Sequence, residues 1–231
     1  MKKEKLKFLL NIFPMFGVFL QRYFTALRLL DKSKDPILDL GCGDGRLTNF
    51  LRRCGKKVIA IDKKKSKRNF NYIIADAEKL PFKDTIFNQI ILLDVLEHIP
   101  NEKSVVEEIT RVINKNGNLI ITIPTNFWKY PFYNFMKFIT PSEESVMRFF
   151  GHVRRGYTLL QIEKLFKKFR IEQTRYYVNK ISVLFFDLEY SNLFVIKNII
   201  LRLLALPLFL NFKLSTKNWG TFIGVRLIKI E

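Results

Sequence analysis

The chain has 231 residues, enough for one ordinary domain with a well-buried core, and its composition of 48% hydrophobic and 26% charged residues excludes global disorder. The formal net charge of +19 favours contact with polyanions, either nucleic acid or anionic lipid head groups, although evenly spread lysines that only solvate the surface would give the same charge. Two cysteines, Cys42 and Cys54, are too few for a disulfide framework and fit a reducing compartment such as the cytoplasm.

The N-terminal segment, residues 1–32, has a basic start followed by an apolar run. Because Asn11 and Pro14 interrupt this run and no small-residue cleavage site follows closely, we expect a helix that caps the domain or lies on a membrane surface, rather than an export signal. No stretch offers the roughly 18 uncharged apolar residues of a simple transmembrane helix. The expected location is therefore the cytoplasm, and the protein could also bind peripherally to the inner membrane surface.

From residue 37 on, apolar runs rich in Ile, Val and Leu alternate with helical patterns, which is typical of a mostly parallel sheet with helices on its faces. The expected strands cover residues 37–40, 57–62, 72–76, 87–93 and 118–124. The expected helices cover residues 46–53 and 102–113, and Gly117 is the expected left-handed cap after the second helix. Only nine residues, 63–71, separate the second strand from the third, so we expect a turn or loop there in place of a crossover helix.

The last third of the chain begins with a helix signal. Thr158 and Gln161 have the spacing of a capping box, in which the two side chains satisfy each other's backbone N–H groups, and the helix is expected to continue through residues 162–169. Residues 170–178 and 221–230 are expected to form an antiparallel strand pair at one edge of the sheet.

Two segments do not fit the alternating plan. Residues 125–157 are aromatic-rich and irregular, and residues 181–214 are more hydrophobic than the chain average, although a short hairpin would suffice between the last two strands. We therefore predict one domain with three parts. These parts are an N-terminal helical cap (1–32), a core (33–178 plus 219–231) and a hydrophobic insertion (179–218).

A glycine-rich turn links the first strand to the first helix. Gly41, Gly43 and Gly45 alternate with other residues there, and glycine both tolerates positive φ and lets a ligand approach the backbone. The helix that follows supplies unpaired backbone N–H groups. Tight packing of strand against helix would also explain such a turn.

Carboxylates end the strands around this turn. Asp62 ends the second strand and has two acceptor oxygens for the two hydroxyls of a ribose. Asp76 ends the third strand beside Ala77 and is placed to read an adenine edge, while Asp39 lies just before the glycines and suits a cationic group. The dinucleotide fingerprint G-x-G-x-x-G is not met, and Asp44 within the turn favours a ligand that has no phosphate.

Four successive segments now resemble motifs of the class I S-adenosylmethionine-dependent methyltransferases. They are "ILDLGCGDGR", "VIAID", "ADAEKLPFKDTIFNQIILLDVLEHIP" and "LIITIP", and "GHVRRGYTLLQIEKLF" resembles a common downstream element of that family. The resemblance implies an α/β fold with a Rossmann-like, doubly wound, mostly parallel seven-stranded sheet and an antiparallel edge pair. It implies S-adenosylmethionine as the methyl donor. Two departures from the family pattern are the short second crossover and Asn88, where an aspartate is common.

The resemblance also implies roles for the strand-end residues. Those that match Asp39, Gly41 and Gly43 line the methionine part of the donor, the match to Asp62 binds the ribose, and Asp76 with Ala77 contacts the adenine. We add two neighbours to this donor site, Cys42 within the turn and Asp94 after the fourth strand.

Methyl transfer from a sulfonium is an in-line displacement, which needs collinear positioning and, where the acceptor must lose a proton, a base. The segment "DVLEHIP" places Asp94, Glu97 and His98 on one side of a helical turn. It resembles the Glu-x-x-Glu-His cluster of quinone-biosynthesis O-methyltransferases, in which a divalent cation is implied. Three interpretations stay open: a bound cation, catalysis by His98 as base with Asp94 beside it, or a purely structural helix start.

The downstream element "GHVRRGYT" carries the expected acceptor-binding residues. These are His152, Arg154, Arg155 and Tyr157. The arginines could clamp a carboxylate or phosphate, or could belong to a solvated loop. Tyr157 could line the pocket, or could staple the start of the helix.

Three hypotheses concern the acceptor. It could be a small or lipid-like molecule, such as a quinone precursor or a glycan intermediate. This hypothesis depends on a helix within 181–214 that would be apolar on most sides and could lie in an anionic membrane interface. The same helix could instead pack inside the protein or in a dimer contact. The acceptor could be RNA, favoured by the net charge and the basic run 63–68 but without interleaved aromatic residues. Alternatively, the chain is a non-catalytic module that only binds the donor. The sequence predicts no oligomeric state.

Overall fold

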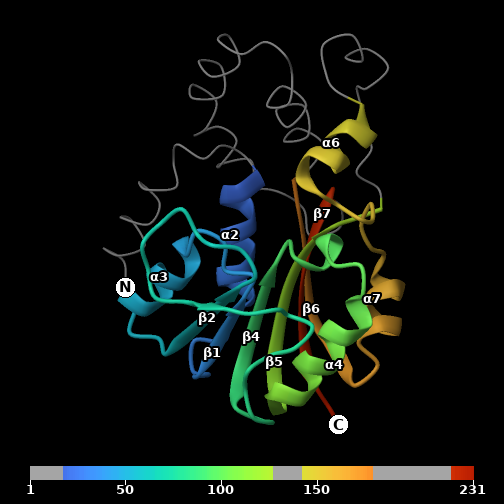
Figure 1. Cartoon of the computed structure of the whole chain (residues 1–231). Helices are drawn as coiled ribbons and strands as arrows, with labels where there is room; N and C mark the ends of the chain where they lie inside the picture. Colours follow the sequence, from blue (N-terminus) through green and yellow to red (C-terminus); the bar gives the residue numbers. More distant parts are fainter. Residues whose placement is uncertain (1–17, 127–141, 179–219) are drawn as a thin grey trace.

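The computed structural model describes residues 18–126, 142–178 and 220–231. In chain order the elements are α2 (Val18–Leu29), β1 (Ile37–Leu40), α3 (Arg46–Arg53), β2 (Val58–Asp62), β3 (Ile73–Ile74), β4 (Phe87–Leu93), the short 3₁₀ helix η1 (Leu96–His98), α4 (Glu102–Val112), β5 (Ile113–Pro124), α6 (Glu143–Phe150), α7 (Leu159–Leu165), β6 (Phe169–Tyr177) and β7 (Phe222–Lys229) (Figure 1).

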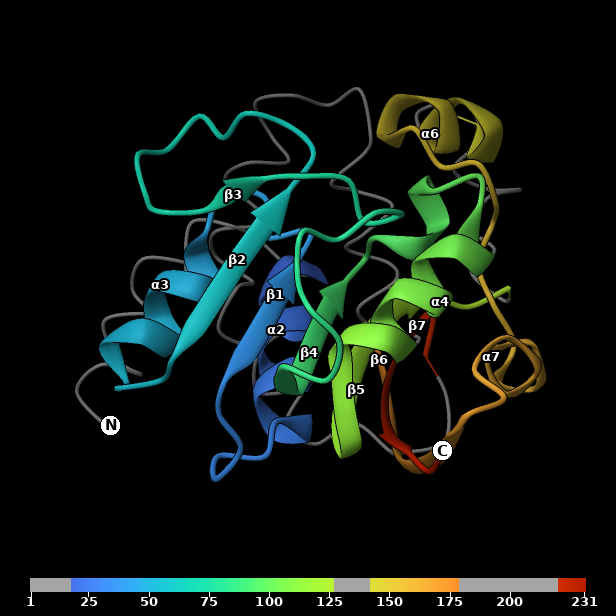
Figure 2. The ribbon, with the colours of Figure 1, turned by 60° about the horizontal axis from the view of Figure 1, so that its bottom comes forward.

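The strands form one seven-stranded sheet in the order β3-β2-β1-β4-β5-β7-β6. The first five strands pair in parallel, whereas β7 is antiparallel to both β5 and β6. The predicted mostly parallel sheet and its antiparallel edge pair are therefore confirmed, and the last strand of the chain lies between β5 and β6 (Figure 2). The order reverses next to β1, and open α/β sheets bind ligands at such a point, beyond the carboxyl ends of the strands.

Helices cover both faces of the sheet, because alternate residues of each central strand point to opposite sides. On one face, Ile37 and Ile91 pack with buried side chains of α2 and α3. On the other face, Leu38 and Ile90 pack with buried side chains of α4 and α7. Figure 2 shows α2 behind the sheet and α4 in front of it.

Helix α2 is the described part of the predicted N-terminal cap. Its side chains Tyr23, Phe24 and Leu29 are buried in the core of that face. The helix lies very close to β7: a Cβ on Gly224 would meet Cγ2 of Thr25 at 2.4 Å. Residues 1–17 lie outside the described residues, so the membrane-surface prediction for the cap stays a prediction.

The prediction that Gly117 caps helix α4 is wrong. The helix ends at Val112, strand β5 begins at once, and the residue with left-handed backbone is Asn116, at φ 61°. Two carbonyls at the end of the helix are satisfied instead by the ammonium of Lys229, whose Nζ donates to Thr110 O at 2.7 Å and to Ile113 O at 3.1 Å. Gly117 is small for another reason, because a Cβ there would meet Cγ1 of Ile113 at 2.6 Å.

The third predicted strand is shorter than expected. Strand β3 contains only Ile73–Ile74, where residues 72–76 were expected, and the nine residues before it form no helix, as predicted. The capping box at the start of α7 is confirmed. The Thr158 hydroxyl accepts from the backbone N–H of Gln161, and the Gln161 side chain accepts from that of Thr158.

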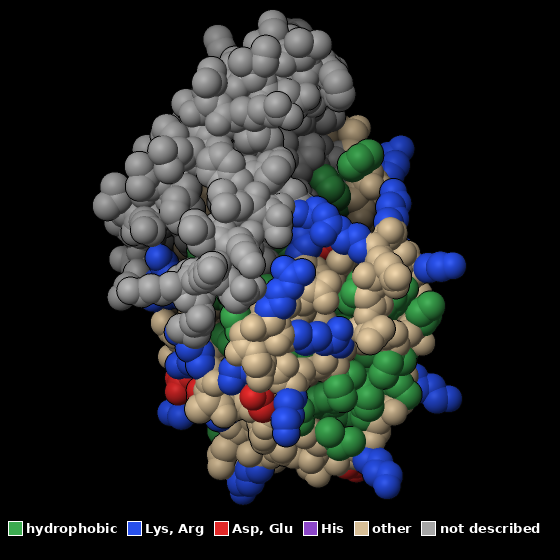
Figure 3. Space-filling model, turned by 90° about the vertical axis from the view of Figure 1, so that its left-hand side faces the viewer, with side chains coloured by type: hydrophobic (Ala, Val, Ile, Leu, Met, Phe, Trp, Pro, Cys, Tyr) green, Lys and Arg blue, Asp and Glu red, His purple; other side chains and the backbone are tan. Residues whose placement is uncertain are grey.

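Basic side chains outnumber acidic ones, 40 to 21 over the whole chain. On the face in Figure 3, Lys and Arg side chains are scattered among neutral surface, with few acidic groups between them. The predicted hydrophobic insertion, 179–218, and most of the aromatic-rich segment after β5 lie outside the described residues. Among the residues that are described, no helix is both long enough and apolar enough to cross a membrane.

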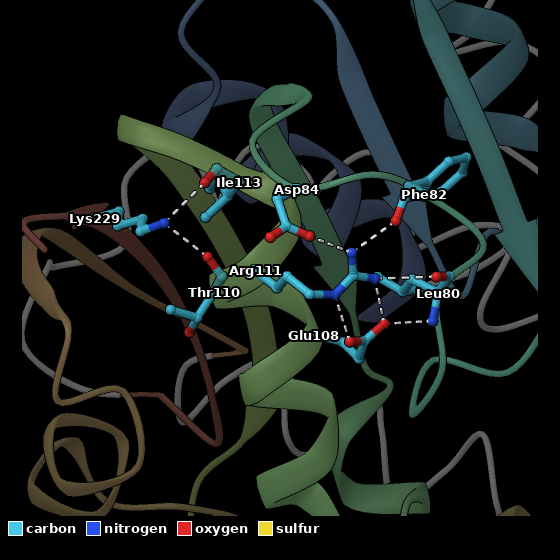
Figure 4. Close-up of polar contacts among 8 residues, drawn as sticks. All are labelled: Leu80, Phe82, Asp84, Glu108, Thr110, Arg111, Ile113 and Lys229. Carbon is cyan, nitrogen blue, oxygen red and sulfur yellow. Dashed lines mark hydrogen bonds and ion pairs between the residues drawn. The ribbon is translucent and has the colours of Figure 1, made fainter.

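A guanidinium fastens the loop before β4 to helix α4. The side chain of Arg111 donates to the backbone carbonyls of Leu80 and Phe82 and to the carboxylates of Asp84 and Glu108, at 2.7–3.1 Å (Figure 4). Glu108 in turn accepts from the backbone N–H of Leu80 at 2.6 Å. This network holds residues 80–84, just before β4, against the last turn of α4.

Candidate functional site

The turn after β1 is held against β2 by its own backbone. The N–H groups of Gly41 and Cys42 both donate to the carbonyl of Ile61, at 2.8 and 2.9 Å. Gly41, Gly43 and Gly45 all have positive φ, at 78°, 55° and 71°. Side chains other than glycine rarely adopt this backbone, so the alternation of glycines is a requirement of the turn.

The three glycines are nevertheless not equivalent. A Cβ on Gly41 would lie 2.4 Å from Cγ2 of Val95, and one on Gly45 would lie 2.5 Å from the ring of Phe70. A Cβ on Gly43 would meet nothing within 4 Å. Close packing therefore explains two of the glycines, while the third leaves its backbone open to a ligand.

A cavity of about 580 Å³ opens beside this turn, within the usual range of small-molecule sites. It is lined by every residue predicted for the donor site: Asp39, Gly41, Cys42, Gly43, Asp62, Asp76, Ala77 and Asp94. The structure thus brings the carboxyl ends of β1, β2 and β4 and the segment after β3 together around one space. Acceptor oxygens and open backbone suit an adenosyl sulfonium compound. Such a compound has no phosphate, so it needs no phosphate-binding turn.

The Asp62 carboxylate joins β2 to the glycine turn. One oxygen accepts from the N–H of Gly43 and the other from the N–H of Lys64, both at 2.8 Å. Each carboxylate oxygen has two lone pairs, so both keep capacity for a ligand hydroxyl. Asp76 is nearer the surface, where the ammonium of Lys63 binds its carboxylate at 2.7 Å and lowers its pKa.

Burial sets the protonation of two other groups at the turn. Burial raises the pKa of Asp39 to about 6, although the hydroxyl of Thr48 donates to its carboxylate and opposes the shift. Burial also raises the pKa of the Cys42 thiol to about 12, and the nearby carboxylates of Asp39 and Asp62 add to the effect. Cys42 is therefore a neutral thiol in the cavity wall at neutral pH.

Asp94 is held on both of its oxygens. Arg22 from α2 donates to one oxygen at 2.9 Å and the hydroxyl of Thr122 from β5 donates to the other at 2.7 Å. Its backbone lies at φ 53°, in the left-handed region that a non-glycine residue adopts only under restraint. Asp94 thus joins α2 to the strand tips, and among the described residues it is not part of the group of ligand atoms that includes Glu97 and His98.

A different residue meets Glu97 and His98. One ligand atom from each of Glu97, His98 and His152 lies within 4.8 Å of the other two. The rings of the two histidines contact edge to face, with centroids 4.6 Å apart. Burial raises the pKa of the Glu97 carboxyl well above its usual range, and the neighbouring Asp94 carboxylate raises it further. Burial lowers the pKa of His152 to about 4, with a further lowering from His98.

The four residues predicted for acceptor binding do not line the cavity. The guanidinium of Arg154 donates to the carbonyls of Leu96, Ile99 and Pro100 at 2.6–3.0 Å and so fastens the downstream element to η1. Tyr157 is buried and its hydroxyl donates to the Glu102 carboxylate, an arrangement that fits a staple. Arg155 is half-buried and outside the cavity wall, so its acceptor role, like those of the other three, stays a prediction.

Among the residues of the cavity wall that the sequence did not predict, four come from helices packed against the sheet. Arg22 and Tyr23 come from α2, and Phe150 and Gly151 come from the end of α6, whereas His98 was predicted and does line the cavity. A basic residue beside an aromatic one in an otherwise apolar helix is a weak signal. Only the packing of α2 across the sheet brings these two side chains to the cavity.

Comparisons with known proteins agree with this geometry. Residues 38–121 match a family described as "Methyltransferase domain". The chain is 34% identical over 104 residues to a ubiquinone biosynthesis O-methyltransferase of Rickettsia conorii, covering 40% of this chain and 36% of that protein. It is 31% identical over 126 residues to an uncharacterised protein of Methanocaldococcus jannaschii, covering 49% and 62%. The chain therefore spans less than two thirds of either relative.

Solved structures resemble the chain over more of its length. The PH0226 protein of Pyrococcus horikoshii has a TM-score of 0.58 at 20% identity and covers 96% of this chain and 97% of its own. The N-methyltransferase NodS of Bradyrhizobium japonicum, solved with S-adenosyl-L-homocysteine, has a TM-score of 0.56 at 14% identity and covers 91% and 87%. At these identities the likeness establishes the fold alone.

Proposed function

The chain carries a class I S-adenosylmethionine-dependent methyltransferase domain, and from this premise we propose that it transfers a methyl group from that donor to a small-molecule or lipid-like acceptor. One observation supports the proposal above the others. The open glycine turn, the strand-end carboxylates and His98 line the same cavity, so donor and acceptor would share one space.

The proposed donor contacts follow from the groups that face this cavity. Asp62 would bind the ribose hydroxyls, because its oxygens keep acceptor capacity beside the turn. Gly41 and Gly43, with Asp39 behind them, would hold the methionine part. Asp76 and Ala77 would contact the adenine. Bound S-adenosylmethionine supplies an electrophilic methyl group on a sulfonium, which already has a good leaving group.

The contribution of the chain is then mainly positioning and the exclusion of water. Val95, Ile99 and Phe150 give the cavity an apolar wall next to Asp94 and His98. A backbone carbonyl can only accept a hydrogen bond, so the contact of 3.3 Å between His98 Nδ1 and Gly151 O favours the tautomer with the proton on Nδ1. The Nε2 lone pair of His98 remains for a proton or a cation. Asp94 holds Arg22 and would lie beside His98 in the wall of the shared cavity.

The small-molecule acceptor is favoured by the relatives named as ubiquinone biosynthesis O-methyltransferases. RNA is the competing acceptor, and the net charge of +19 favours it. Within the basic run 63–68, however, Lys63 is paired with Asp76 and Arg68 with Asp44, so two of its charges are already engaged at the cavity rim. Figure 3 shows Lys and Arg side chains at many points of one face, several of them next to one another near its centre.

Incubation with radiolabelled donor separates these alternatives. The full chain is mixed with donor and with fractionated small metabolites, lipids and RNA from cells, and the fraction that gains label is identified. Label in the metabolite or lipid fraction supports the proposal. Label in RNA would replace it by the RNA alternative, and calorimetric donor binding without labelling of any fraction would indicate a module that only binds the donor.

Membrane contact requires its own measurement. The hypothesis concerns residues 179–218, and it predicts that the chain sediments with anionic liposomes and that deletion of residues 190–212 abolishes sedimentation while donor binding persists. Sedimentation that survives the deletion would refute it.

A further inference from the structure

We propose that Glu97, His98 and His152 form a binding site for a divalent transition-metal cation of the Zn²⁺ class, beside the cavity, where η1 meets the segment after α6. The site differs from the cluster that the sequence suggests, because His152 takes the place of Asp94. The proposal goes beyond methyl transfer, since binding of the ion requires neither donor nor acceptor.

The first support is the convergence of the histidines. The sequence contains only two, 54 positions apart, and their rings are in contact. The segment after α6 is fastened to η1 by its backbone: Val153 N–H donates to the carbonyl of Glu97 at 2.9 Å. His152 N–H donates to the carbonyl of Met147, also at 2.9 Å, and Gly151 turns the chain with φ 71°. His152 is therefore held beside η1 by the main chain, independently of its ring.

The second support is a buried carboxylate without a partner. Glu97 is 1% exposed, and neither of its carboxylate oxygens has a hydrogen-bond partner in the part of the chain that the structure describes. The buried Nδ1 of His152 likewise has no partner among the described residues. Buried polar groups in proteins are normally paired, and a carboxylate out of water needs a compensating charge or bond. A cation that binds both groups would satisfy them together.

The third support is the orientation of His98. Its Nδ1 contacts the carbonyl of Gly151, and this leaves the lone pair of Nε2 for an ion. Histidines that bind metals commonly donate their other ring N–H to a backbone carbonyl in this way, which fixes both the tautomer and the ring.

The donor set selects the ion. Two imidazole nitrogens with one carboxylate suit Zn²⁺ and related first-row ions, whereas Mg²⁺ prefers oxygen ligands. In a tetrahedral site with bonds of about 2.0 Å the ligand atoms lie about 3.3 Å apart. The three groups, now within 4.8 Å, would have to close by no more than about 1.5 Å, which side-chain rotation supplies. Among the described residues three protein ligands converge, which would leave a fourth position for water.

Asp94 is bonded to Arg22 and Thr122, and among the described residues it is not one of the ligand groups that lie within 4.8 Å of one another. An ion at the three ligands would engage the Nε2 lone pair of His98, so His98 would act on an acceptor through the ion and not as a direct base. Only this last consequence rests on the proposed function.

The test uses the metal alone. The full chain is stripped with a chelator and titrated with Co²⁺, whose visible d–d absorption reports low coordination number, and then with Zn²⁺ as competitor. We expect one equivalent of Co²⁺ to bind, Zn²⁺ to displace it, and Mg²⁺ in excess to leave the spectrum unchanged. Zn²⁺ is also expected to raise the thermal unfolding midpoint, because it binds the folded state.

Variants identify the ligands. Glu97→Gln and His152→Gln should each weaken Co²⁺ binding at least tenfold, while Asp94→Asn, the matched control on the same segment, should bind within threefold of the unmodified chain. His152 is only half-buried, so its variant keeps the test valid should Glu97→Gln fail to fold. No Co²⁺ binding by the unmodified chain would overturn the proposal, as would binding that Asp94→Asn abolishes and His152→Gln leaves intact. Donor affinity by calorimetry, measured without metal, tests the proposed function separately.

Discussion

The carboxylate of Asp62 accepts a hydrogen bond of 2.8 Å from the backbone N–H of Gly43, so the last residue of β2 is bonded to the turn that follows β1. Gly43 is also the glycine whose missing Cβ leaves open space. One contact therefore fixes both an acceptor carboxylate and an exposed piece of backbone at the same wall of the cavity. The donor site can therefore be tested by substituting either partner of this hydrogen bond, Asp62 or Gly43.

Asp62→Ala is expected to lower the affinity for S-adenosylmethionine at least tenfold, or about 1.4 kcal/mol, because the ribose hydroxyls would lose their acceptor. Titration calorimetry measures this. Asp84→Ala is the matched control, since Asp84 is also a carboxylate that accepts a hydrogen bond, here from Arg111 of α4, but lies away from the cavity, and it should leave donor affinity unchanged. Equal affinity of the Asp62 variant and the unmodified chain would exclude Asp62 as the ribose ligand.

Gly43→Ala should block donor binding, and its cost to the stability of the fold should be limited to the strain of its left-handed backbone. The added Cβ meets no protein atom within 4 Å, but φ is 55°, which costs about 1 kcal/mol for alanine. Donor affinity is expected to fall at least tenfold, since the methyl group would occupy space meant for the ligand.

Gly55→Ala provides a matched control for that strain. Gly55 has φ 81°, also has nothing within 4 Å of a built Cβ, and lies outside the cavity wall. Both variants should therefore lose a similar unfolding free energy in urea, and only the Gly43 variant should lose the donor. Normal donor binding by Gly43→Ala would show that the open side of the turn is not the donor site.

The sequence predicted the strand ends and the glycine turn well because they depend on neighbouring residues. A run such as Ile37–Leu40 followed by glycines indicates a strand and a turn without knowledge of the rest of the chain. Parallel strands end at one edge, so Asp39 and Asp62 could be placed together before their contacts were known.

What could not be predicted depends on packing between distant segments. The bond between Arg22 and Asp94 spans 72 residues and requires α2 to cross the sheet. The contact of His98 with His152 requires the segment after α6 to return to η1. Gly117 was misplaced for a related reason, because the cap of α4 comes from Lys229 at the far end of the chain.

Asp39 should make stability fall as pH rises. Its pKa is 3.8 in an unfolded chain and about 6 in the folded protein, so the folded state binds more protons between these values. Stability therefore decreases from about pH 4 to about pH 6 and levels off above, and the ionised carboxylate costs up to about 3 kcal/mol. Asp39→Asn removes this titration but keeps an acceptor for the hydroxyl of Thr48.

Urea unfolding at several pH values checks the sign. The unfolding free energy of Asp39→Asn, minus that of the unmodified chain, should increase between pH 4 and pH 6 and stay constant to pH 8. A difference that decreases over this range would mean that the folded protein stabilises the ionised carboxylate.

Arg111 should contribute more to the free energy of unfolding than an ordinary surface arginine does. Its guanidinium joins two backbone carbonyls and two carboxylates, and it connects the loop before β4 to helix α4 (Figure 4). Removal would leave the carbonyls of Leu80 and Phe82 without this donor. Arg111→Ala is therefore expected to lower the unfolding free energy by about 2 kcal/mol in urea at neutral pH.

Arg148→Ala is the control for this last prediction, because Arg148 forms a single ion pair with Glu144 one turn away on α6, and both side chains are about 80% exposed. Exposed pairs of this kind contribute about 0.5 kcal/mol or less, since solvent screens the charges and long side chains lose freedom on pairing. The Arg111 variant should also leave donor affinity within twofold, because neither Arg111 nor its partners line the cavity. Equal losses from the two variants would show that the bonds of Arg111 act as separate surface contacts, and that the loop before β4 is held by the packing of its apolar side chains.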